Sequence, residues 1–412
     1  MTDAWVDLPG HRAWLHREEL RLTDFGMAAA LPGGGFGWLD ADGRRSADPA
    51  VHTWITARMT HVYSLAHLRG IPGAGPLADN GLAALTGRLR DSEHGGWFSS
   101  TDAAGAAPAA TGKSAYDHAF VVLAAASATV AGRPGAAPLL EEALGVVEQH
   151  FFDTATGLSV EGYDRDWSVC EDYRGANSNM HLVEAFLAAA DATGDTVWRD
   201  RALGIAERLI HRITAANGWR LPEHFTAGWE PVLDYNRDQP AHPFRPFGST
   251  VGHWLEWARL LVALDASLGE AAPGWLVEDA ERLFDLSLTH GWDVDGAAGF
   301  VYTLDWDDRP VVRERMHWVP AEALMTAAAL RRRTGEERYE EAYRTLWDYV
   351  RRYLVDTARG SWHHELAPDN TPSATVWAGK PDLYHAYQAV LLPLLPAAPS
   401  AATALRANGA AL

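Results

Sequence analysis

A glycine followed by a bulky side chain recurs six times along the chain at nearly regular spacing. Successive bulky residues lie 59, 61, 61, 81 and 62 positions apart, which leaves room for two helices and a turn in each unit. The turns are Gly37-Trp38, Gly96-Trp97, Gly157-Leu158, Gly218-Trp219, Gly299-Phe300 and Gly360 to Trp362. Helix pairs repeated in this way can close into a ring around a central cavity. The repeat therefore predicts an all-α (α/α)6 barrel of six inner and six outer helices.

Two kinds of segment alternate between these turns. Amphipathic stretches, with apolar residues at three- and four-residue spacing, predict outer helices at 9–21, 77–90, 138–150, 196–212, 275–289 and 336–353. Segments rich in His, Trp, Tyr, Asn and acidic residues predict inner helices that begin near Trp54, Ser114, Ala176, Gly248, His317 and Lys380. The glycine turns themselves predict short β-ribbons in the loops at one end of the barrel. The longer fourth interval comes from an insertion at 222–246, which is either a rim loop or an insertion without a role.

Composition narrows the class of protein. The 412 residues contain no Ser/Gly-rich or charge-dense linker, so we expect one catalytic domain over residues 1–412. A hydrophobic fraction of 47% and 18 Trp exclude a disordered chain. A net charge of −19, with Lys113 and Lys380 as the only lysines, argues against nucleic acid or an anionic membrane as partner.

Cysteine content and hydropathy indicate the compartment. A single cysteine, Cys170, excludes an internal disulfide and a Cys-rich zinc site. The N-terminus shows no basic region followed by an apolar core, and charged residues interrupt every apolar run before it could span a bilayer. We therefore expect a cytoplasmic protein, whose state as monomer or homo-oligomer the sequence leaves undecided.

Histidines stand at helical spacing from polar partners in the predicted inner helices. His253 and Glu256 are three positions apart, as are His385 and Gln388, so each pair shares one helix face. Histidine accepts and returns protons near neutral pH, and a neighbouring carboxylate can orient its ring. Taken alone, such a pair is more often a surface pair or a core pair with satisfied hydrogen bonds.

Convergence of several such faces favours a functional site. The third inner segment places Asn177, His181 and Glu184 four and three positions apart, and the first places Trp54 and Arg58 four apart. If the inner segments line one cavity, its polar set comprises Arg58, Tyr116, Asp117, His118, Asn177, His181, His253, Glu256, Trp318, Glu322 and His385. Aromatic faces combined with hydrogen-bonding groups suit a sugar, which presents C–H patches and hydroxyls together.

A purely structural role explains part of this set equally well. Helix packing with one satisfied hydrogen bond accounts for Trp54, Tyr116, Asp117 and His118 as well as sugar binding does.

Four motifs resemble those of the N-acylglucosamine 2-epimerase superfamily. They are Gly252-His-x-x-Glu256-Trp-Ala-Arg259, His317-Trp318-x-Pro320-x-Glu322, Tyr384-His385-Ala386 and Arg174-x-x-Asn177-x-Asn179-x-His181. Trp54-x-x-x-Arg58 and the run Tyr116 to Phe120 are most similar to the aldose-ketose isomerase branch, which includes mannose isomerase and sulfoquinovose isomerase. The resemblance covers nearly the whole chain, and it implies an (α/α)6 barrel that uses no cofactor.

The resemblance also implies roles for single residues. His253 and His385 would be the acid/base pair. The residues that would bind or orient the sugar are Arg58, Asn177, His181, Glu256, Trp318, Trp54, Tyr116 and Glu322. The expected reaction is isomerisation of a free monosaccharide, with D-mannose to D-fructose as the first choice. A sulfonated sugar is the alternative, although Arg58 is the one well-placed cation, with Arg237 or Arg245 on the rim.

Aldose-ketose isomerisation has simple chemical requirements. A base removes the C2 proton, a cis-enediol forms, and the proton returns to C1 while another proton moves between O1 and O2. Two histidines suffice, provided that donors such as Arg58 and His181 stabilise the enediolate oxygens. We assign His385 as the base at carbon, and His253, tuned by Glu256, to ring opening and the oxygens; the reverse assignment stays open.

Other functions remain possible at this level. A sugar 2-epimerase shares the first proton abstraction and differs in where the proton returns. Barrels of this type also carry glycoside hydrolases, for which Glu256, Glu322, Asp117 and Asp172 could supply an acid and a base. A sugar-binding protein without turnover is a third possibility.

Metal ligation finds little support in the sequence. The chain has no His-x-His or His-Glu-x-x-His spacing. His363 and His364 are adjacent in a predicted ribbon, where neighbouring side chains point to opposite faces. We expect neither a metal nor a cofactor.

Overall fold

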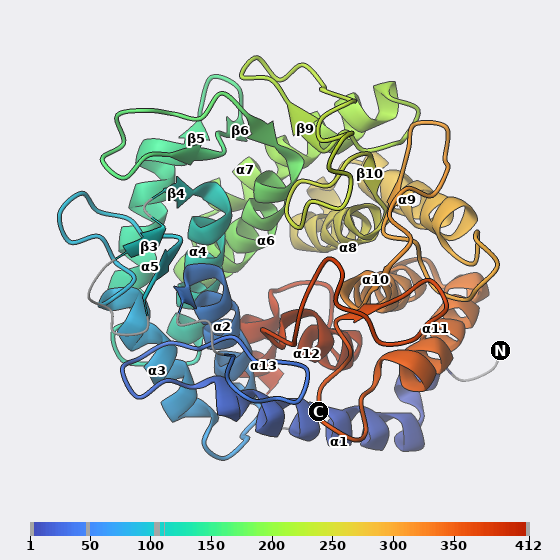
Figure 1. Ribbon diagram of the computed structural model, residues 1–412, viewed down its shortest axis with the longest axis horizontal. Helices are drawn as coiled ribbons and strands as arrows, with labels where there is room; N and C mark the ends of the chain where they lie inside the picture. The colour runs from blue at the N-terminus through green and yellow to red at the C-terminus, as the bar shows by residue number, and fades with distance from the viewer. Residues whose placement is uncertain (1–3, 47–49, 103–107, 111, 409–412) are drawn as a thin grey trace.

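The computed structural model describes residues 4–46, 50–102, 108–110 and 112–408. Within this described part, six inner helices are surrounded by six outer ones (Figure 1). The inner helices are α2 (Thr53–Leu68), α4 (Ala115–Val130), α6 (Ala176–Thr193), α8 (Val251–Leu268), α10 (Trp318–Thr334) and α12 (Tyr384–Leu391). The outer helices are α1 (Pro9–Gly26), α3 (Ala74–Thr86), α5 (Ala136–Val146), α7 (Val197–Ala206), α9 (Trp275–Gly291) and α11 (Glu337–Tyr349). The predicted (α/α)6 barrel is confirmed.

The inner and outer helices differ in which faces are apolar. Beyond its first turn α4 is a run of Phe, Val, Leu and Ala, and it is buried over nearly its whole length. In α11 the buried residues include Tyr339, Tyr343, Leu346 and Trp347, while charged residues occupy the opposite face. A helix enclosed by other helices is apolar all round, whereas a surface helix needs one apolar stripe. Composition thus separates the two rings.

The outer helices extend beyond their α-helical bounds, which explains why several were predicted to be longer. The π-helical turns η3 (Val147–Phe151), η4 (Glu207–Thr214) and η6 (Val350–Leu354) continue α5, α7 and α11. Short 3-10 turns are η1 (Trp5–Asp7), η2 (Met27–Ala29), η5 (Gly269–Ala271) and η7 (Leu392–Leu394).

Two inner helices begin later than predicted, for local reasons. α8 begins at Val251 because the two residues before it form β10 (Ser249–Thr250), which pairs with β11 (Thr303–Leu304). α12 begins at Tyr384, where the Oδ1 atom of Asp382 accepts the backbone N–H at 2.8 Å. A carboxylate that accepts this N–H satisfies one of the backbone donors that have no partner in the first turn of a helix.

Short antiparallel ribbons join successive units at one end of the barrel, as predicted. The strand before an inner helix pairs with the strand after the next glycine turn. Besides β10 and β11, the pairs are β1 (Val51–His52) with β2 (Ser100–Thr101), β4 (Lys113–Ser114) with β7 (Gly162–Tyr163), β8 (Arg174–Gly175) with β9 (His224–Phe225), and β12 (Arg315–Met316) with β13 (Glu365–Leu366). β3 (Pro108–Ala110) pairs with β2, and β5 (Phe152–Asp153) with β6 (Leu158–Ser159). Because each joining ribbon spans two units, it positions neighbouring inner helices relative to one another.

Two of the repeated glycines meet both a conformational and a steric requirement. Gly96 has φ 68° and Gly299 has φ 107°, in the region that side chains other than glycine rarely adopt. A Cβ at Gly299 would lie 2.4 Å from the Tyr349 hydroxyl, and one at Gly96 would lie 2.8 Å from Nε2 of His118. The bulky residue that follows is buried: the Trp97 indole donates to the carbonyl of residue 85 on α3 at 2.6 Å.

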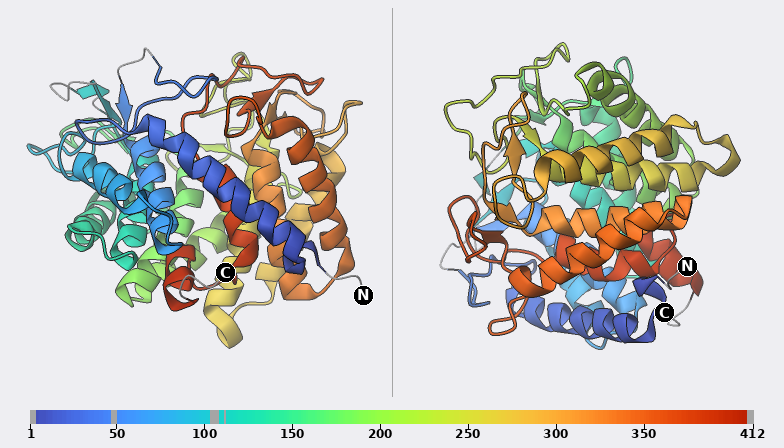
Figure 2. Two further views of the ribbon diagram at one scale, coloured as in Figure 1. Left: turned by 90° about the horizontal axis from the view of Figure 1, so that it is seen from below. Right: turned by 90° about the vertical axis from the view of Figure 1, so that its right-hand side faces the viewer.

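The first outer helix closes the ring against the last inner helix. α1 packs beside α12, and the Trp362 indole donates to Glu18 at 2.8 Å while the Tyr387 hydroxyl donates to Glu19 at 3.0 Å. At the end opposite the ribbons, α13 (Ala401–Asn408) packs against α2, α4 and α6 (Figure 2). No described helix is long and apolar enough to cross a membrane.

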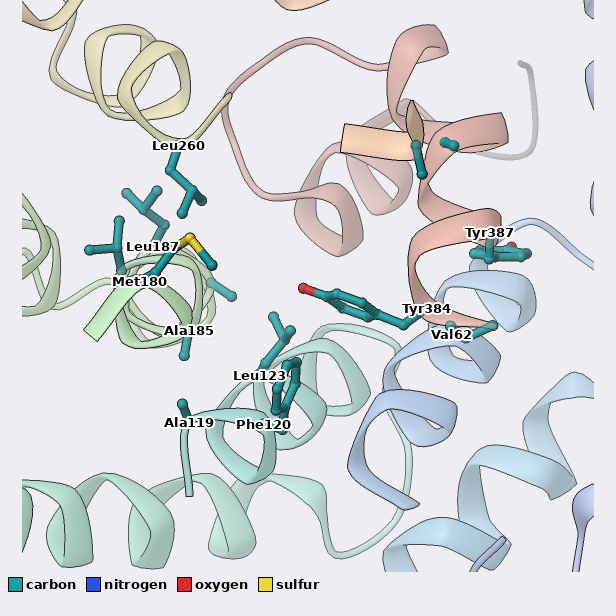
Figure 3. Packing of buried hydrophobic residues seen from close by; sticks show 14 of the residues in the cluster. Val62, Ala119, Phe120, Leu123, Met180, Ala185, Leu187, Leu260, Tyr384 and Tyr387 are labelled. Atoms are coloured by element: carbon teal, nitrogen blue, oxygen red, sulfur yellow. The ribbon is translucent and has the colours of Figure 1, made fainter. Parts of the chain in front are cut away.

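Apolar side chains fill the middle of the barrel. Phe120 of α4 packs against the ring of Tyr384, with ring centres 5.4 Å apart, and Leu123, Leu187 and Leu260 line the interior towards the α13 end (Figure 3). The barrel is therefore a packed core, with a cavity of about 700 Å³ at the ribbon end and one of about 900 Å³ at the α13 end.

Candidate active site

The cavity at the ribbon end receives side chains from every inner helix and from the loops above them. Its walls are formed by Trp54, Arg58, Tyr116, Asn177, His181, Pro243, Phe244, Pro246, His253, Glu256, Tyr302, His317, Trp318, His364, Trp377, Pro381, Asp382 and His385. All the predicted proton-transfer and sugar-binding residues lie in this wall except Glu322. Asn177, His181, His253 and Glu256 share this cavity as their spacing predicted, whereas Glu184 and Gln388 line the second cavity at the α13 end.

Two histidines in this wall are held by carboxylates in the same way. Nδ1 of His253 lies 2.9 Å from Oε2 of Glu223, and Nδ1 of His385 lies 2.9 Å from Oε1 of Glu322. A carboxylate accepts the Nδ1 proton and leaves Nε2 of a neutral ring with a lone pair. The Trp318 ring lies close to both, 5.4 Å from the His253 ring and 5.6 Å from that of His385.

The carboxylate that orients His253 is not the predicted one. Glu256 shares a helix face with His253, but it lies about one turn further along α8 and approaches His181, with Oε1 3.6 Å from Nδ1. Glu223 takes the place beside His253, and its other oxygen accepts the N–H of Thr250 at 3.1 Å. Glu223 belongs to the loop before β9, so no helical spacing could have revealed it.

Glu322 supports His385 from behind the cavity wall. Its side chain is fully buried, and its second oxygen accepts from Nε of Arg259 at 2.8 Å. Glu322 was predicted to bind or orient the sugar; four residues after Trp318 on α10, it lies in the layer beneath the cavity and is not part of the wall.

Arg259 lies within a group of buried carboxylates below this wall. Its guanidinium is 3.4 Å from Glu184 and 3.7 Å from Glu256, in addition to its bond to Glu322. Among the described residues, His181, Glu184 and Glu256 are the group whose donor atoms come close enough to hold a metal, within 4.8 Å of one another. Arg259 already supplies positive charge to both of these carboxylates, which disfavours a divalent cation.

Two of these buried groups favour their neutral forms. Burial, together with the Glu322 carboxylate, raises the pKa of Glu256 well above its ordinary value, so this carboxyl can hold a proton and donate it in a hydrogen bond. Burial and the Arg58 cation lower the pKa of His181 well below its usual value.

Arg58 is held in a box of aromatic rings. Its guanidinium donates to the Tyr116 hydroxyl at 2.9 Å and to Asp382 at 3.3 Å. It also lies 4.4 Å from the centre of the Phe120 ring and 4.8 Å from that of Tyr384. These contacts fix the cation, and Asp382 balances its charge.

Several polar atoms in the cavity wall have no hydrogen-bond partner within the protein. They are Asn177 Oδ1, His181 Nδ1, Glu256 Oε1, His317 Nε2 and His364 Nε2, all buried. Buried polar atoms are nearly always hydrogen-bonded in folded proteins. Their convergence on one cavity leaves several donors and acceptors for a ligand bound there.

Two residues of the predicted polar set serve the fold instead. Oδ2 of Asp117 accepts from the hydroxyls of Ser99 and Ser114, at the start of α4. His118 accepts the N–H of Trp97 at 3.2 Å and so supports the glycine turn. Successive helical residues are rotated by about 100°, so that Asp117 and His118 turn away from the cavity that Tyr116 faces.

The 222–246 insertion reaches over the cavity, as a rim loop would. Phe244 lies 5.2 Å, ring to ring, from Trp377 of the loop before α12. Arg245 pairs instead with Glu171 at 2.7 Å and does not line the cavity. The insertion therefore contributes apolar surface at the mouth.

The remaining wall residues were missed from the sequence. Tyr302, His364 and Trp377 come from loops and ribbons, where spacing gives no direction, whereas His317 and Asp382 stand beside predicted residues. Only tertiary contacts place them in the wall.

An (α/α)6 barrel with two carboxylate-bound histidines in a sugar-sized cavity defines a class of carbohydrate-converting proteins. Residues 34–389 match the N-acylglucosamine 2-epimerase (GlcNAc 2-epimerase) family, and the chain belongs to this family. The chain is 60% identical to a D-mannose isomerase of Thermobifida fusca, over 98% of this chain and 99% of the relative. It is 53% identical to a D-mannose isomerase of Pseudomonas cannabina pv. alisalensis, over 98% and 97%.

A solved structure is similar along the whole barrel. A crystal structure of a D-mannose isomerase superposes with a TM-score of 0.87 at 29% identity, covering 94% of this chain and 99% of the other.

Proposed function

We propose that the chain is an aldose-ketose isomerase that converts D-mannose to D-fructose by proton transfer between histidines and an open-chain sugar. The observation that carries this proposal is the pair of carboxylate-bound histidines, His253 and His385, which both lie beside Trp318 in one cavity. The full-length similarity to D-mannose isomerases supports the choice of substrate.

The proposed reaction begins with ring opening. His253 takes the O1 proton as the C1–O5 bond breaks and passes it to O5, so that the free aldehyde forms and His253 is again neutral. Nε2 of His385 then removes the C2 proton, and the electron pair of that bond forms the C1–C2 double bond while O1 takes the negative charge of the enediolate. His385 returns its proton to C1 as O2 loses its own proton to His253, which passes that proton to O1, so that both histidines end neutral and no proton is gained or lost.

The cavity offers donors to the developing oxyanion. Arg58 is a fixed cation, and the protonated carboxyl of Glu256 can donate a hydrogen bond. Preorganised donors of this kind stabilise an enediolate more than the sugar from which it forms. Trp318 provides an apolar face for the carbon chain.

The arrangement favours isomerisation over glycoside hydrolysis. Hydrolysis needs two carboxyl groups that flank a bond. Within the described part of the wall the carboxyl groups are those of Glu256 and Asp382, and Asp382 is bound to Arg58. Glu223 and Glu322 hold histidines rather than facing the sugar.

Incubation of the purified protein with D-mannose in deuterated water tests the proposal. We expect D-fructose, with deuterium at C1 wherever the histidine exchanges its proton with solvent before returning it. Formation of D-glucose instead would identify a 2-epimerase. Neither conversion nor exchange across a panel of free aldoses would overturn the proposal.

A further inference from the structure

Two histidines that belong to neither proton-transfer pair face each other across a ribbon. In the β12–β13 ribbon Arg315 is opposite Leu366 and Met316 is opposite Glu365. The same register continued by one residue places His317 opposite His364, and the His317 N–H donates to the His364 carbonyl at 3.0 Å. Their rings stack, with centres 3.8 Å apart and planes 19° from parallel.

Both side chains are positioned to bind a ligand in the cavity. They line the cavity, they are only 6% and 7% exposed, and Nε2 of each has no partner within the protein. Nδ1 of His317 lies 3.3 Å from the His364 carbonyl, a contact that requires the proton on Nδ1. Nε2 of His317 therefore carries a lone pair and accepts a hydrogen bond from the cavity.

The lone pair on Nε2 of His317 favours a hydroxyl, which can donate a hydrogen bond to it, over an anion, which cannot. A sugar hydroxyl can donate to Nε2 of His317, whereas a fully ionised phosphate or sulfonate offers only acceptors. Protonation would be needed to bind such an anion, and burial opposes it by lowering the pKa of His317 to about 4. The nearby cations Arg58 and Lys380 are bound to Asp382 and Asp356 and are not free to replace that charge.

The pair lies beside one proton-transfer histidine. The His317 ring is 6.2 Å from the His385 ring, at nearly a right angle to it. With the reacting carbons at His385, as the proposed function requires, a ring 6.2 Å away is within reach of a hydroxyl beyond C2.

We propose that the stacked His317 and His364 rings form the subsite for a sugar hydroxyl remote from C1 and C2, and that they select aldoses with an uncharged chain end over those that end in phosphate or sulfonate. This subsite rests on the proposed isomerase function, because it takes the orientation of the sugar from the position of the reacting carbons.

The subsite is tested by substituting a histidine in the protein and removing a hydroxyl from the sugar, separately and together. kcat/KM is measured for D-mannose, 4-deoxy-D-mannose, 6-deoxy-D-mannose and D-lyxose with wild type, His317→Gln and His364→Gln. His363→Gln is the matched control, because this neighbour faces away toward Asp356, at 3.8 Å, and does not line the cavity. We expect wild type to lose about tenfold on one analogue, and the two subsite variants to lose much less on that analogue. Ratios measured on one preparation are unaffected by partial misfolding.

The outcomes separate the subsite from the activity. If the loss in kcat/KM from each substitution and the loss from each missing hydroxyl multiply for every analogue, as with the His363→Gln control, the subsite is overturned while the isomerase activity stands. Wild-type kcat/KM for D-mannose 6-phosphate equal to that for D-mannose would overturn the selection against anions. If wild type converts no neutral aldose, the proposed function has failed. Calorimetric binding of D-mannitol and 6-deoxymannitol then tests the subsite without turnover. Equal affinities of wild type for the two alcohols would count against the subsite.

Discussion

The two carboxylate-histidine pairs have the same hydrogen-bond length and different surroundings. Glu322 comes from the rigid helix α10, is fully buried and is also bonded to Arg259. Glu223 comes from the loop before β9 and bonds a backbone N–H instead. His385 therefore belongs to a buried charged network, whereas His253 lies beneath the rim loop, with 11% of its side chain exposed.

This difference indicates how the two histidines divide the reaction. Burial, and next the Arg58 cation, lower the pKa of His385 well below the ordinary histidine value. His385 is thus held neutral, as a base at carbon must be before it acts. His253, nearer the mouth and on a looser support, suits proton exchange with the sugar oxygens.

The largest expected effect comes from removing either histidine. His385→Asn and His253→Asn should each lower kcat by at least about 10³-fold, since each removes a proton carrier. Deuterium exchange at C2 of D-mannose distinguishes them: His253→Asn keeps slow exchange from the open-chain fraction, and His385→Asn loses it. The opposite result would reverse the assignment, and circular dichroism checks that both variants fold.

Substitutions of the two supporting carboxylates should also have unequal effects, with the larger effect at the carboxylate that holds His385. Glu322→Gln should lower kcat by roughly 10²- to 10³-fold, because His385 loses its orienting acceptor. It should also lower the free energy of unfolding by about 3 kcal/mol, because Arg259 keeps its buried charge and loses a partner. Glu223→Gln should cost about tenfold in kcat and little stability. Denaturant unfolding and steady-state kinetics measure both, and equal losses in the two variants would remove the distinction between the pairs.

The rim should affect binding more than turnover. Phe244→Ala removes an aromatic wall at the mouth that touches neither carboxylate-histidine pair, so KM should rise about three- to tenfold with kcat changed less than about twofold. Val169→Ala, at an exposed position outside the cavity wall, is the control. A fall in kcat with unchanged KM would show that the loop acts on the chemical step.

The smallest effect is on stability against pH. The folded-state pKa of His385 lies below the value of about 6.5 for an unfolded histidine, so the unfolded chain binds the extra proton first. The stability contributed by neutral His385 is complete above pH 6.5 and is lost as the pH falls below it. His385→Asn should make that loss shallower by up to about 1.4 kcal/mol per pH unit. Thermal unfolding from pH 7 to pH 5 measures the slope, and equal slopes for variant and wild type would contradict the depressed pKa.

Helical spacing predicted the site well where helices supply it. Arg58, His181, His253 and His385 face one cavity because residues three and four apart share a helix face that the ring turns inward. The same rule misplaced Glu256, because sharing a face with His253 does not mean touching its ring. The spacing was not used to separate Tyr116 from Asp117, although Tyr116 lies four positions before Phe120 and the two rings pack with centres 5.0 Å apart.

The sequence by itself determined the barrel, because a sixty-residue period that holds two helices has few other ways to bury its apolar faces. It also determined that His181, His253 and His385 face the cavity, because local helix geometry orients them. The tertiary structure decided their partners: Glu223, His364 and Trp377 lie in loops and ribbons, and only the closed ring brings them to the site. Local periodicity orients a side chain on its own helix, whereas a contact between distant segments depends on how the whole chain packs.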